Sequence, residues 1–348
     1  MGKQTEKIST LIISRTDSLG DVMLTLPMAG IIKKFMPGVR VVFLGRNYTR
    51  AIIEASEHVD AFLNWDLLKE MQARDKIQHL KTIDADAILH VFPDKDIASL
   101  AKKAGIPIRA GTSHRAFHLL YCNKLLHFSR KNSGLHESQL NLKLLSAIGI
   151  QVSLSISEIE PFTGFSKTKA LDPRFGALLD PGKFNLILHP RSKGSAREWG
   201  LENFSKLITL LPQEQFKIFI SGTKEEGQSM QSFIHENQEA TDLTGKLSLE
   251  EFISFIAHAD GLLAASTGPL HIASALGKKA IGIFSPMHPI HPGRWAPIGP
   301  GAEFLVKNTT CSDCRKNNDC HCIREVSPEV VRDRLLLASA AEKISGPQ

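Results

Sequence analysis

Short apolar runs alternate with segments of helical spacing over the first half of the chain. The apolar runs predict strands at 10–14, 40–44, 60–63, 87–91 and 106–110. Helical spacing predicts a helix that begins or kinks at Pro27, and further helices at 48–56, 67–83 and 136–148. Residues 15–21 are predicted as a polar loop after the first strand. Because strands and helices alternate, this part predicts a doubly wound α/β domain of parallel strands.

The same alternation returns after residues 153–182, where prolines and glycines interrupt the pattern as in a linker. Strands are predicted at 186–188, 216–220, 241–243, 261–265 and 280–284, with helices between them. The predicted organisation is two Rossmann-like domains at 1–160 and 183–327, a linker at 161–182, and a final helix at 328–348. Ligands of such sheets bind at the carboxyl ends of the strands, so a cleft between the domains is the expected site.

The segment 260–284 reads as one β-α-β unit whose loop consists of small residues. Its strand ends before Ser266, and Pro269 suits the first turn of the following helix. The free N–H groups of that turn and the positive end of the helix dipole favour an anion. Thr267 and His271 add a hydroxyl and an imidazole there. A buried β-α-β unit with a short polar loop is the alternative.

Charge is distributed unevenly along the 348 residues, whose formal net charge is +6. Residues 1–155 carry 21 Lys and Arg against 14 Asp and Glu, a net of +7, and residues 97–136 contain no acidic residue. Cations interleaved with leucines there suit an anionic amphiphile or a membrane face, and nucleic acid less specifically. The alternative is a solvated surface whose charges share a sign. No apolar run approaches the ~20 residues of a membrane span, and the polar start lacks the apolar core of a secretory signal, which indicates a cytoplasmic protein.

Four motifs occur in a fixed order along the chain. They are Gly20-Asp21-Val22 with Thr25-Leu26-Pro27, then Arg197-Glu198-Trp199, then Gly222 with Glu225-Glu226, and finally Ser266-Thr267-Gly268-Pro269-Leu270-His271. Together they resemble the lipopolysaccharide heptosyltransferases, glycosyltransferase family 9, over residues 10–335. The resemblance implies the GT-B architecture, with two Rossmann-like domains facing a central cleft and a C-terminal helix that crosses back toward the N-terminal domain. It also implies transfer of heptose from ADP-heptose to the inner core of lipopolysaccharide, with inversion and without a required cofactor or catalytic metal.

The resemblance implies roles for individual residues. Asp21 matches the base that takes the proton of the acceptor hydroxyl; helix N-capping is its alternative role, and Asp17 is the rival base. On the donor side, Ser192 and Arg197 match positions that contact the diphosphate. Glu226 matches the acidic position that binds the nucleoside, with Glu225 as its rival. The remaining positions belong to the loop of the donor site: Ser266, Thr267, Gly268 and His271.

Two positions depart from the family pattern. Ser266 stands where many members have an Asp that contacts the donor sugar, and the segment His90–Asp94 differs from the commoner version near the acceptor. A GT-B transferase that uses another ADP- or UDP-sugar and a different acceptor is therefore the second hypothesis. The expected partners are a nucleotide sugar, a lipid-linked phosphorylated saccharide and the inner face of the cytoplasmic membrane, with peripheral attachment and no nucleic acid.

Four cysteines are grouped before the final helix, at Cys311, Cys314, Cys320 and Cys322. Four sulfurs in this spacing can form a tetrahedral, structural zinc site, although the last pair is separated by one residue instead of two. A structured loop without metal is the alternative. A zinc-containing nucleic-acid-binding protein is the third hypothesis, but the chain carries no recognised nucleic-acid-binding motif.

Overall fold

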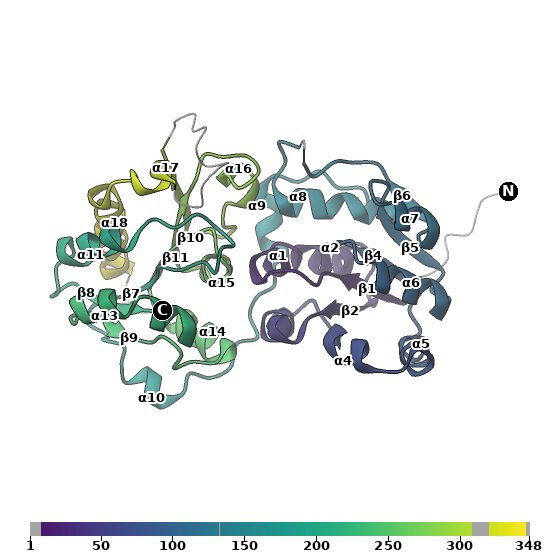
Figure 1. Cartoon of the computed structure of the whole chain (residues 1–348), viewed down its shortest axis with the longest axis horizontal. Helices are drawn as coiled ribbons and strands as arrows, with labels where there is room; N and C mark the ends of the chain where they lie inside the picture. Colours follow the sequence, from purple (N-terminus) through teal and green to yellow (C-terminus); the bar gives the residue numbers. More distant parts are fainter. Residues whose placement is uncertain (1–7, 132, 308–319, 346–348) are drawn as a thin grey trace. The chain divides into compact units, whose positions relative to one another are not determined.

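The computed structural model describes residues 8–131, 133–307 and 320–345. The chain divides into two compact units, Met1–Lys167 and Thr168–Gln348, and the division falls within the predicted linker (Figure 1). Residues before the division belong to the first unit: a Cβ on Gly30 would lie 2.4 Å from the carbonyl oxygen of Phe162. Residues after it belong to the second unit, where the Ser254 hydroxyl donates to Lys169 O at 2.7 Å. The predicted linker is therefore packed onto the first unit at Phe162 and onto the second unit at Lys169.

The described part of the first unit contains a parallel sheet of six strands in the order β3-β2-β1-β4-β5-β6. Its strands are β1(Thr10–Ser14), β2(Arg40–Gly45), β3(Ala61–Asn64), β4(Ala87–His90), β5(Ile108–Thr112) and β6(Lys124–Leu126). Its α-helices are α1(Leu19–Met23), α2(Pro27–Phe35), α3(Arg50–Glu54), α4(Trp65–Glu70), α5(Ala73–Thr82), α6(Lys95–Ala104), α7(Ala116–Tyr121), α8(Glu137–Leu142) and α9(Ile156–Ile159). Short 3₁₀ helices are η1(Asn47–Thr49), η2(Lys143–Ile148) and η3(Glu160–Phe162).

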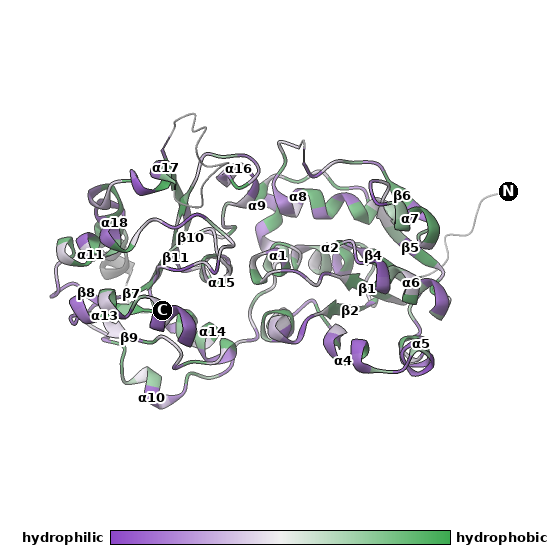
Figure 2. Ribbon diagram, in the orientation of Figure 1, coloured by the Kyte–Doolittle hydropathy of each residue, from purple (hydrophilic) through white to green (hydrophobic). Residues whose placement is uncertain are grey.

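Strands β1 and β4 lie at the centre of this sheet because their side chains are apolar on both faces. Ile12 and Ile88 are register partners, and on one face they pack with Ile97, Leu100 and other apolar residues into a core. Two of the helices on that face begin at side-chain caps: Asn64 caps α4, and Asp94 caps α6. In Figure 2 the strands are mostly green, whereas α5 is largely purple.

The described part of the second unit also contains six parallel strands, in the order β12-β11-β10-β7-β8-β9. The strands are β7(Phe184–His189), β8(Phe216–Ile220), β9(Thr241–Asp242), β10(Gly261–Ala265), β11(Lys279–Phe284) and β12(Ala302–Val306). The helices are α10(Pro173–Gly176), α11(Leu201–Leu210), α12(Lys224–Ser229), α13(Gln231–Glu236), α14(Leu249–His258), α15(Gly268–Ala275), α16(Pro292–Trp295), α17(His321–Arg324) and α18(Pro328–Ser345).

The final helix, α18, packs against α11 of its own unit. Val331 and Leu335 on α18 join Phe204 and Leu207 on α11 in one apolar core. Trp199, buried before α11, donates its indole N–H to Val326 O at 2.8 Å and so fixes the approach to α18. The predicted crossing of this helix toward the N-terminal domain stays a prediction. No helix in the described ranges is long and apolar enough to cross a membrane.

The two-domain α/β prediction is confirmed, while several element boundaries were wrong. The predicted loop 15–21 gives way to α1 at Leu19, so Asp21 lies in a helix. The predicted helix 67–83 is two helices, α4 and α5, with Met71 in extended backbone between them. Strands β6 and β12 were not predicted, because β6 has three residues with exposed Lys124 and Leu125, and β12 shows no fully buried position.

Candidate active site

The strand orders place a topological switch point in each unit. In both units the first and fourth strands of the unit are neighbours, β1 with β4 and β7 with β10, which gives the 3-2-1-4-5-6 order of dinucleotide-binding sheets. Chain connections leave these neighbours in opposite directions, so their carboxyl ends border a crevice where ligands bind. The first motif begins in α1, the first helix after β1, and the last motif directly follows β10.

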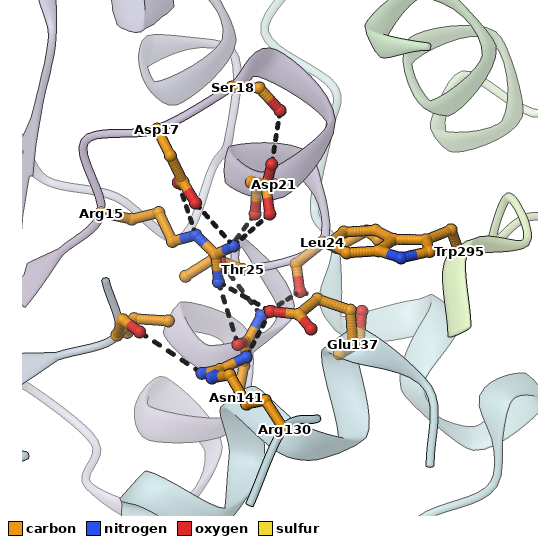
Figure 3. Close-up of polar contacts among 12 residues, drawn as sticks. Arg15, Asp17, Ser18, Asp21, Leu24, Thr25, Arg130, Glu137, Asn141 and Trp295 are labelled. Atoms are coloured by element: carbon orange, nitrogen blue, oxygen red, sulfur yellow. Dashed lines mark hydrogen bonds and ion pairs between the residues drawn. The ribbon is translucent and has the colours of Figure 1, made fainter. Parts of the chain in front are cut away.

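Arg15, the first residue after β1, is the centre of the polar cluster in the first unit (Figure 3). Its Nε donates to Asp17 Oδ1 at 2.7 Å and its Nη2 to Asp17 Oδ2 at 3.0 Å. The same Nη2 donates to Asp21 Oδ1, and the Ser18 hydroxyl donates to Asp21 Oδ2. Asp21 is therefore held by two donors, with its side chain still partly exposed at 17%.

Glu137 at the start of α8 holds the other side of Arg15. Its Oε1 accepts from Arg15 Nη1 at 3.0 Å and also from Arg130 Nη1, although Glu137 itself is buried. Asn141, one turn later, accepts from Arg15 Nη1 at 3.2 Å and donates to Leu24 O at 3.0 Å. Helix α8 thus positions both Arg15 and the junction between α1 and α2.

The charges of the cluster shift the pKa values of Arg15 and Asp17. Burial alone would lower the pKa of Arg15, but Asp21, Asp17 and Glu137 outweigh burial and raise it. Burial raises the pKa of Asp17, which Arg15 opposes and the nearby charge of Asp21 reinforces. Both oxygens of Asp17 accept from Arg15, whereas those of Asp21 are divided between Arg15 and Ser18. Of the two rivals, Asp21 makes fewer hydrogen bonds with Arg15, although its side chain is slightly less exposed than that of Asp17.

His90 ends β4, next to the Ser14 that ends β1. It is fully buried, and neither of its ring nitrogens has a hydrogen-bond partner in the structure. Burial lowers the pKa of His90 to about 3, and His118, with its ring centroid 5.7 Å away, lowers it further. The segment His90–Asp94, which differs from the family pattern, therefore begins with a neutral, buried imidazole at this switch point.

The second unit holds its donor-side residues in a loop that follows β7. Ser192 donates its backbone N–H to Glu198 Oε1 at 2.8 Å, and its hydroxyl contacts Ala196 O at 3.0 Å. Arg191 donates to Glu198 Oε2 at 3.0 Å. The Ser192 hydroxyl therefore links two parts of the loop, and Glu198 holds the loop backbone at Ser192. Arg197 is half-buried in the same loop, and Lys193 is exposed with a left-handed φ of 49°.

Glu226 is buried in the first turn of α12, where it forms a capping box with Thr223. Its Oε2 accepts from Thr223 N at 2.7 Å, and its own N–H donates to the Thr223 hydroxyl at 3.3 Å. The neighbouring Glu225 is exposed, and hydrogen bonds with its own backbone and with Thr223 lower its pKa. One oxygen of Glu226 is thus used by the helix cap.

Helix α15 begins at Gly268, with Thr267 as the residue before it and Pro269 in its first turn. Thr267 is buried, its hydroxyl makes no capping hydrogen bond, and its Oγ1 has no partner in the structure. His271 is buried on the same helix, and Ser266 is partly exposed before it. A buried hydroxyl at the positive end of a helix matches the predicted anion-binding loop.

Two of the residues that were missed from the sequence lie at strand ends. Arg15 and His189 each stand at the end of an apolar strand, β1 and β7, and that position was the available signal. His189 Nδ1 lies 3.0 Å from Ser221 Oγ, and Ser221 donates to Leu188 O. Burial lowers the pKa of His189 to about 4, against the opposing effect of Glu226 and Glu198. His189 is therefore a neutral imidazole beside the two donor-side carboxylates.

The predicted metal site is divided by the limits of the described residues. Cys311 and Cys314 lie outside them, while Cys320 and Cys322 are buried in the apolar core that contains α11 and α18. Over 8–131, 133–307 and 320–345, no group of three or more His, Cys, Asp or Glu side chains could hold a metal ion. The predicted zinc site stays a prediction.

Solved structures show the same fold over nearly the whole chain. The structure of Escherichia coli ADP-heptose LPS heptosyltransferase II superposes with a TM-score of 0.76 at 15% identity, covering 96% of this chain and 99% of that one. The two Rossmann-like units give the chain the GT-B architecture. The model of glycosyltransferase family 9 (heptosyltransferase) matches residues 74–322, more than half of the chain, so the protein belongs to that family.

Two curated relatives agree with this assignment. A Haemophilus influenzae protein, named only as a glycosyltransferase, is 25% identical over 303 residues, which are 83% of this chain and 86% of that protein. Lipooligosaccharide heptosyltransferase 2 of Campylobacter jejuni is 22% identical over 328 residues, 91% of this chain and 95% of that one. The family prediction made from the four motifs is confirmed.

Proposed function

We propose that the protein is an inverting glycosyltransferase that moves heptose from ADP-heptose to the phosphorylated inner core of lipopolysaccharide or a related lipid-linked saccharide. It works without a catalytic metal, as a peripheral enzyme at the inner face of the cytoplasmic membrane. Support comes from family membership and from the names of the Escherichia coli and Campylobacter jejuni proteins. The observation that carries the proposal is the position of Asp21 and of Thr267–Gly268, each beyond the carboxyl end of a strand at a switch point.

Asp21 acts as the general base in this proposal. Its carboxylate takes the proton of the acceptor hydroxyl as that oxygen forms a bond to the anomeric carbon and the bond to the diphosphate breaks on the opposite face. Arg15 and Ser18 fix the rotamer of Asp21, because each donates to one of its oxygens. A fixed carboxylate has less orientational freedom to lose before proton transfer.

The second unit holds the departing nucleotide. The N-terminus of α15, the Thr267 hydroxyl and the backbone of Gly268 contact the diphosphate, with His271 beside them. Arg197, together with Arg191 and Lys193, offsets the charge that grows on the leaving group. Glu226 binds the ribose hydroxyls with its second carboxylate oxygen, the one that does not take part in the helix cap.

A second candidate function is a transferase for another ADP- or UDP-sugar. The observation that favours it is the partly exposed Ser266, where a carboxylate would be expected beside a heptose. Transfer assays over a panel of nucleotide sugars, with ADP and UDP affinities from calorimetry, separate the two candidates. ADP-heptose as the preferred donor supports the first, and a hexose donor supports the second.

Substitution of the proposed base tests the mechanism. Asp21→Asn should lower kcat by about 10²–10⁴-fold and leave ADP affinity unchanged, because it removes proton transfer and no donor contact. The matched control is Asp17→Asn, which removes the other aspartate carboxylate that accepts from Arg15. Steady-state transfer assays and calorimetry measure both. A larger loss of kcat in Asp17→Asn than in Asp21→Asn would assign the base to Asp17.

A further inference from the structure

One surface of the first unit exposes leucines among cations. It combines the end of α6, helix α7 and the edge strand β6, and we call it the α7–β6 face. Leu119 and Leu120 on α7 are 59% and 65% exposed, and Leu125 on β6 is 42% exposed. The cations of the face are exposed as well: Lys102, Lys103 and Lys124.

The three elements of the face are held side by side (Figure 1). Lys102 Nζ donates to Leu120 O at 2.8 Å and lies 5.9 Å from the centroid of the Tyr121 ring, which joins α6 to α7. Arg109 Nε on β5 donates to Tyr121 O at 2.8 Å, and Ala110 pairs with Lys124 in the sheet. The exposed leucines and lysines therefore share one rigid surface.

The inner side of α7 explains why its leucines point outward. His118 is buried against Gly111, where an added Cβ would lie 2.7 Å from His118 Nδ1. His118 Nδ1 also lies 2.9 Å from Thr112 O. Because His118 is fixed inward, Leu119 and Leu120 are turned away from the core, and they cannot be buried without turning this helix.

The charge of the face selects its partner. No acidic residue occurs over 97–136, and within the described ranges none of the three lysines forms an ion pair. Lysines that keep their charge unpaired around apolar side chains match an anionic bilayer, where leucines enter the acyl boundary and ammonium groups meet headgroup phosphates. A protein partner would need a complementary acidic, apolar surface.

We infer that the α7–β6 face binds an anionic phospholipid bilayer and attaches the first unit to it. The inference specifies the membrane contact of the proposed function and rests on it. This contact fixes the orientation of the first unit on the bilayer: the sheet edge at β6 and the leucines of α7 face the lipid.

Vesicle binding tests this assignment without acceptor or nucleotide. The full-length protein should co-sediment with vesicles of phosphatidylglycerol and phosphatidylcholine, and not with phosphatidylcholine alone. Leu119→Glu with Leu120→Glu should abolish sedimentation. Lys103→Gln and Lys124→Gln should each lower the partition coefficient about fivefold, which is the effect of one cation at such a surface.

The matched control is Leu337→Glu on α18, where the native side chain is 67% exposed in the second unit. This variant should bind vesicles like the native protein. Equal binding by the α7 double variant, equal binding to neutral vesicles, or a native dimer that the double variant abolishes would each overturn the assignment. ADP calorimetry on the native protein runs in parallel. A native protein that binds ADP but not anionic vesicles refutes the face alone, and a native protein that binds vesicles but not ADP refutes the proposed function alone.

Discussion

At the scale of single residues, several buried polar groups lie at or near the carboxyl ends of β1 and β4. Arg15 and Glu137 are both buried and are stabilised by charged and amide partners. Removing one member of such a network leaves an uncompensated charge, which costs about 3–5 kcal/mol. His90 is a different case, because it is buried as a neutral ring with neither nitrogen hydrogen-bonded in the structure. Its contribution to stability therefore depends on pH.

His90 predicts acid destabilisation of the first unit. Its folded pKa of about 3 lies below the unfolded value of about 6.5, so the unfolded chain binds the proton first. The stability is complete above about pH 6.5 and is lost progressively as pH falls toward 3. At pH 5 the loss amounts to about 2 kcal/mol. From pH 7 to pH 5, the free energy of unfolding of His90→Leu, measured with urea, should fall by about 2 kcal/mol less than that of the native protein.

The pH range supplies its own control for this variant. Between pH 7 and 8 the imidazole is neutral in both states, so the native protein and His90→Leu should differ by a constant free energy of unfolding. Parallel curves all the way down to pH 5 would show that His90 does not contribute.

At the scale of elements, α14 and α15 begin in different ways. Ser248 caps α14 with a full capping box, in which its hydroxyl accepts from Glu251 N at 3.3 Å and its N–H donates to Glu251 Oε2 at 2.8 Å. Thr267 stands at the same position of α15 without using its hydroxyl. The first turn of α15 therefore lacks the side-chain cap that stabilises α14, and under the proposed function the Thr267 hydroxyl serves the ligand instead.

This difference predicts opposite results for two matched substitutions. Thr267→Val should leave the free energy of unfolding unchanged or slightly higher, because no capping bond is lost, and should weaken ADP binding about tenfold. Ser248→Ala should lower stability by about 1 kcal/mol and leave ADP binding unchanged. Thermal unfolding and calorimetry measure both variants. A Thr267→Val protein that is destabilised but binds ADP normally would make Thr267 an ordinary cap.

Sequence reasoning predicted the elements better than the contacts. The period of the apolar residues was enough for most strands, for the start of α2 at Pro27 and for the two-domain fold. It failed at β6, which is stabilised by pairing with β5 instead of by burial. The roles of Glu137 and Asn141 were also missed, because both reach Arg15 from more than a hundred residues away. Spacing along the chain carries no signal for such a contact.

At the scale of the whole molecule, each unit has its own sheet and core. The proposed donor residues all belong to the second unit, while the proposed base and the α7–β6 face belong to the first. The excess positive charge lies in the first half of the sequence, with +7 over residues 1–155 and −1 over the rest, from 21 basic and 22 acidic residues. Nucleotide and lipid should therefore act on different units.

ADP should stabilise the second unit selectively. At a concentration 100-fold above its Kd, a ligand adds about 2.7 kcal/mol to the state that binds it. Variants that retain a single tryptophan report on each unit, since Trp65 is buried in the first and Trp199 in the second. When ADP is added, the urea midpoint of unfolding reported by Trp199 fluorescence should rise. The midpoint reported by Trp65 fluorescence should not change. Equal shifts would show that the chain unfolds as one cooperative body.

The shared strand order of the two sheets has a consequence for engineering. Each unit carries its own pair of central strands, β1 with β4 or β7 with β10, and within the described ranges each sheet consists of strands from one unit only. If the proposed function holds, donor and acceptor preference should be separable by cutting the chain between Lys167 and Thr168. Recombining either half with its counterpart from another family member at that junction should yield hybrid enzymes that inherit the sugar from one parent and the acceptor from the other.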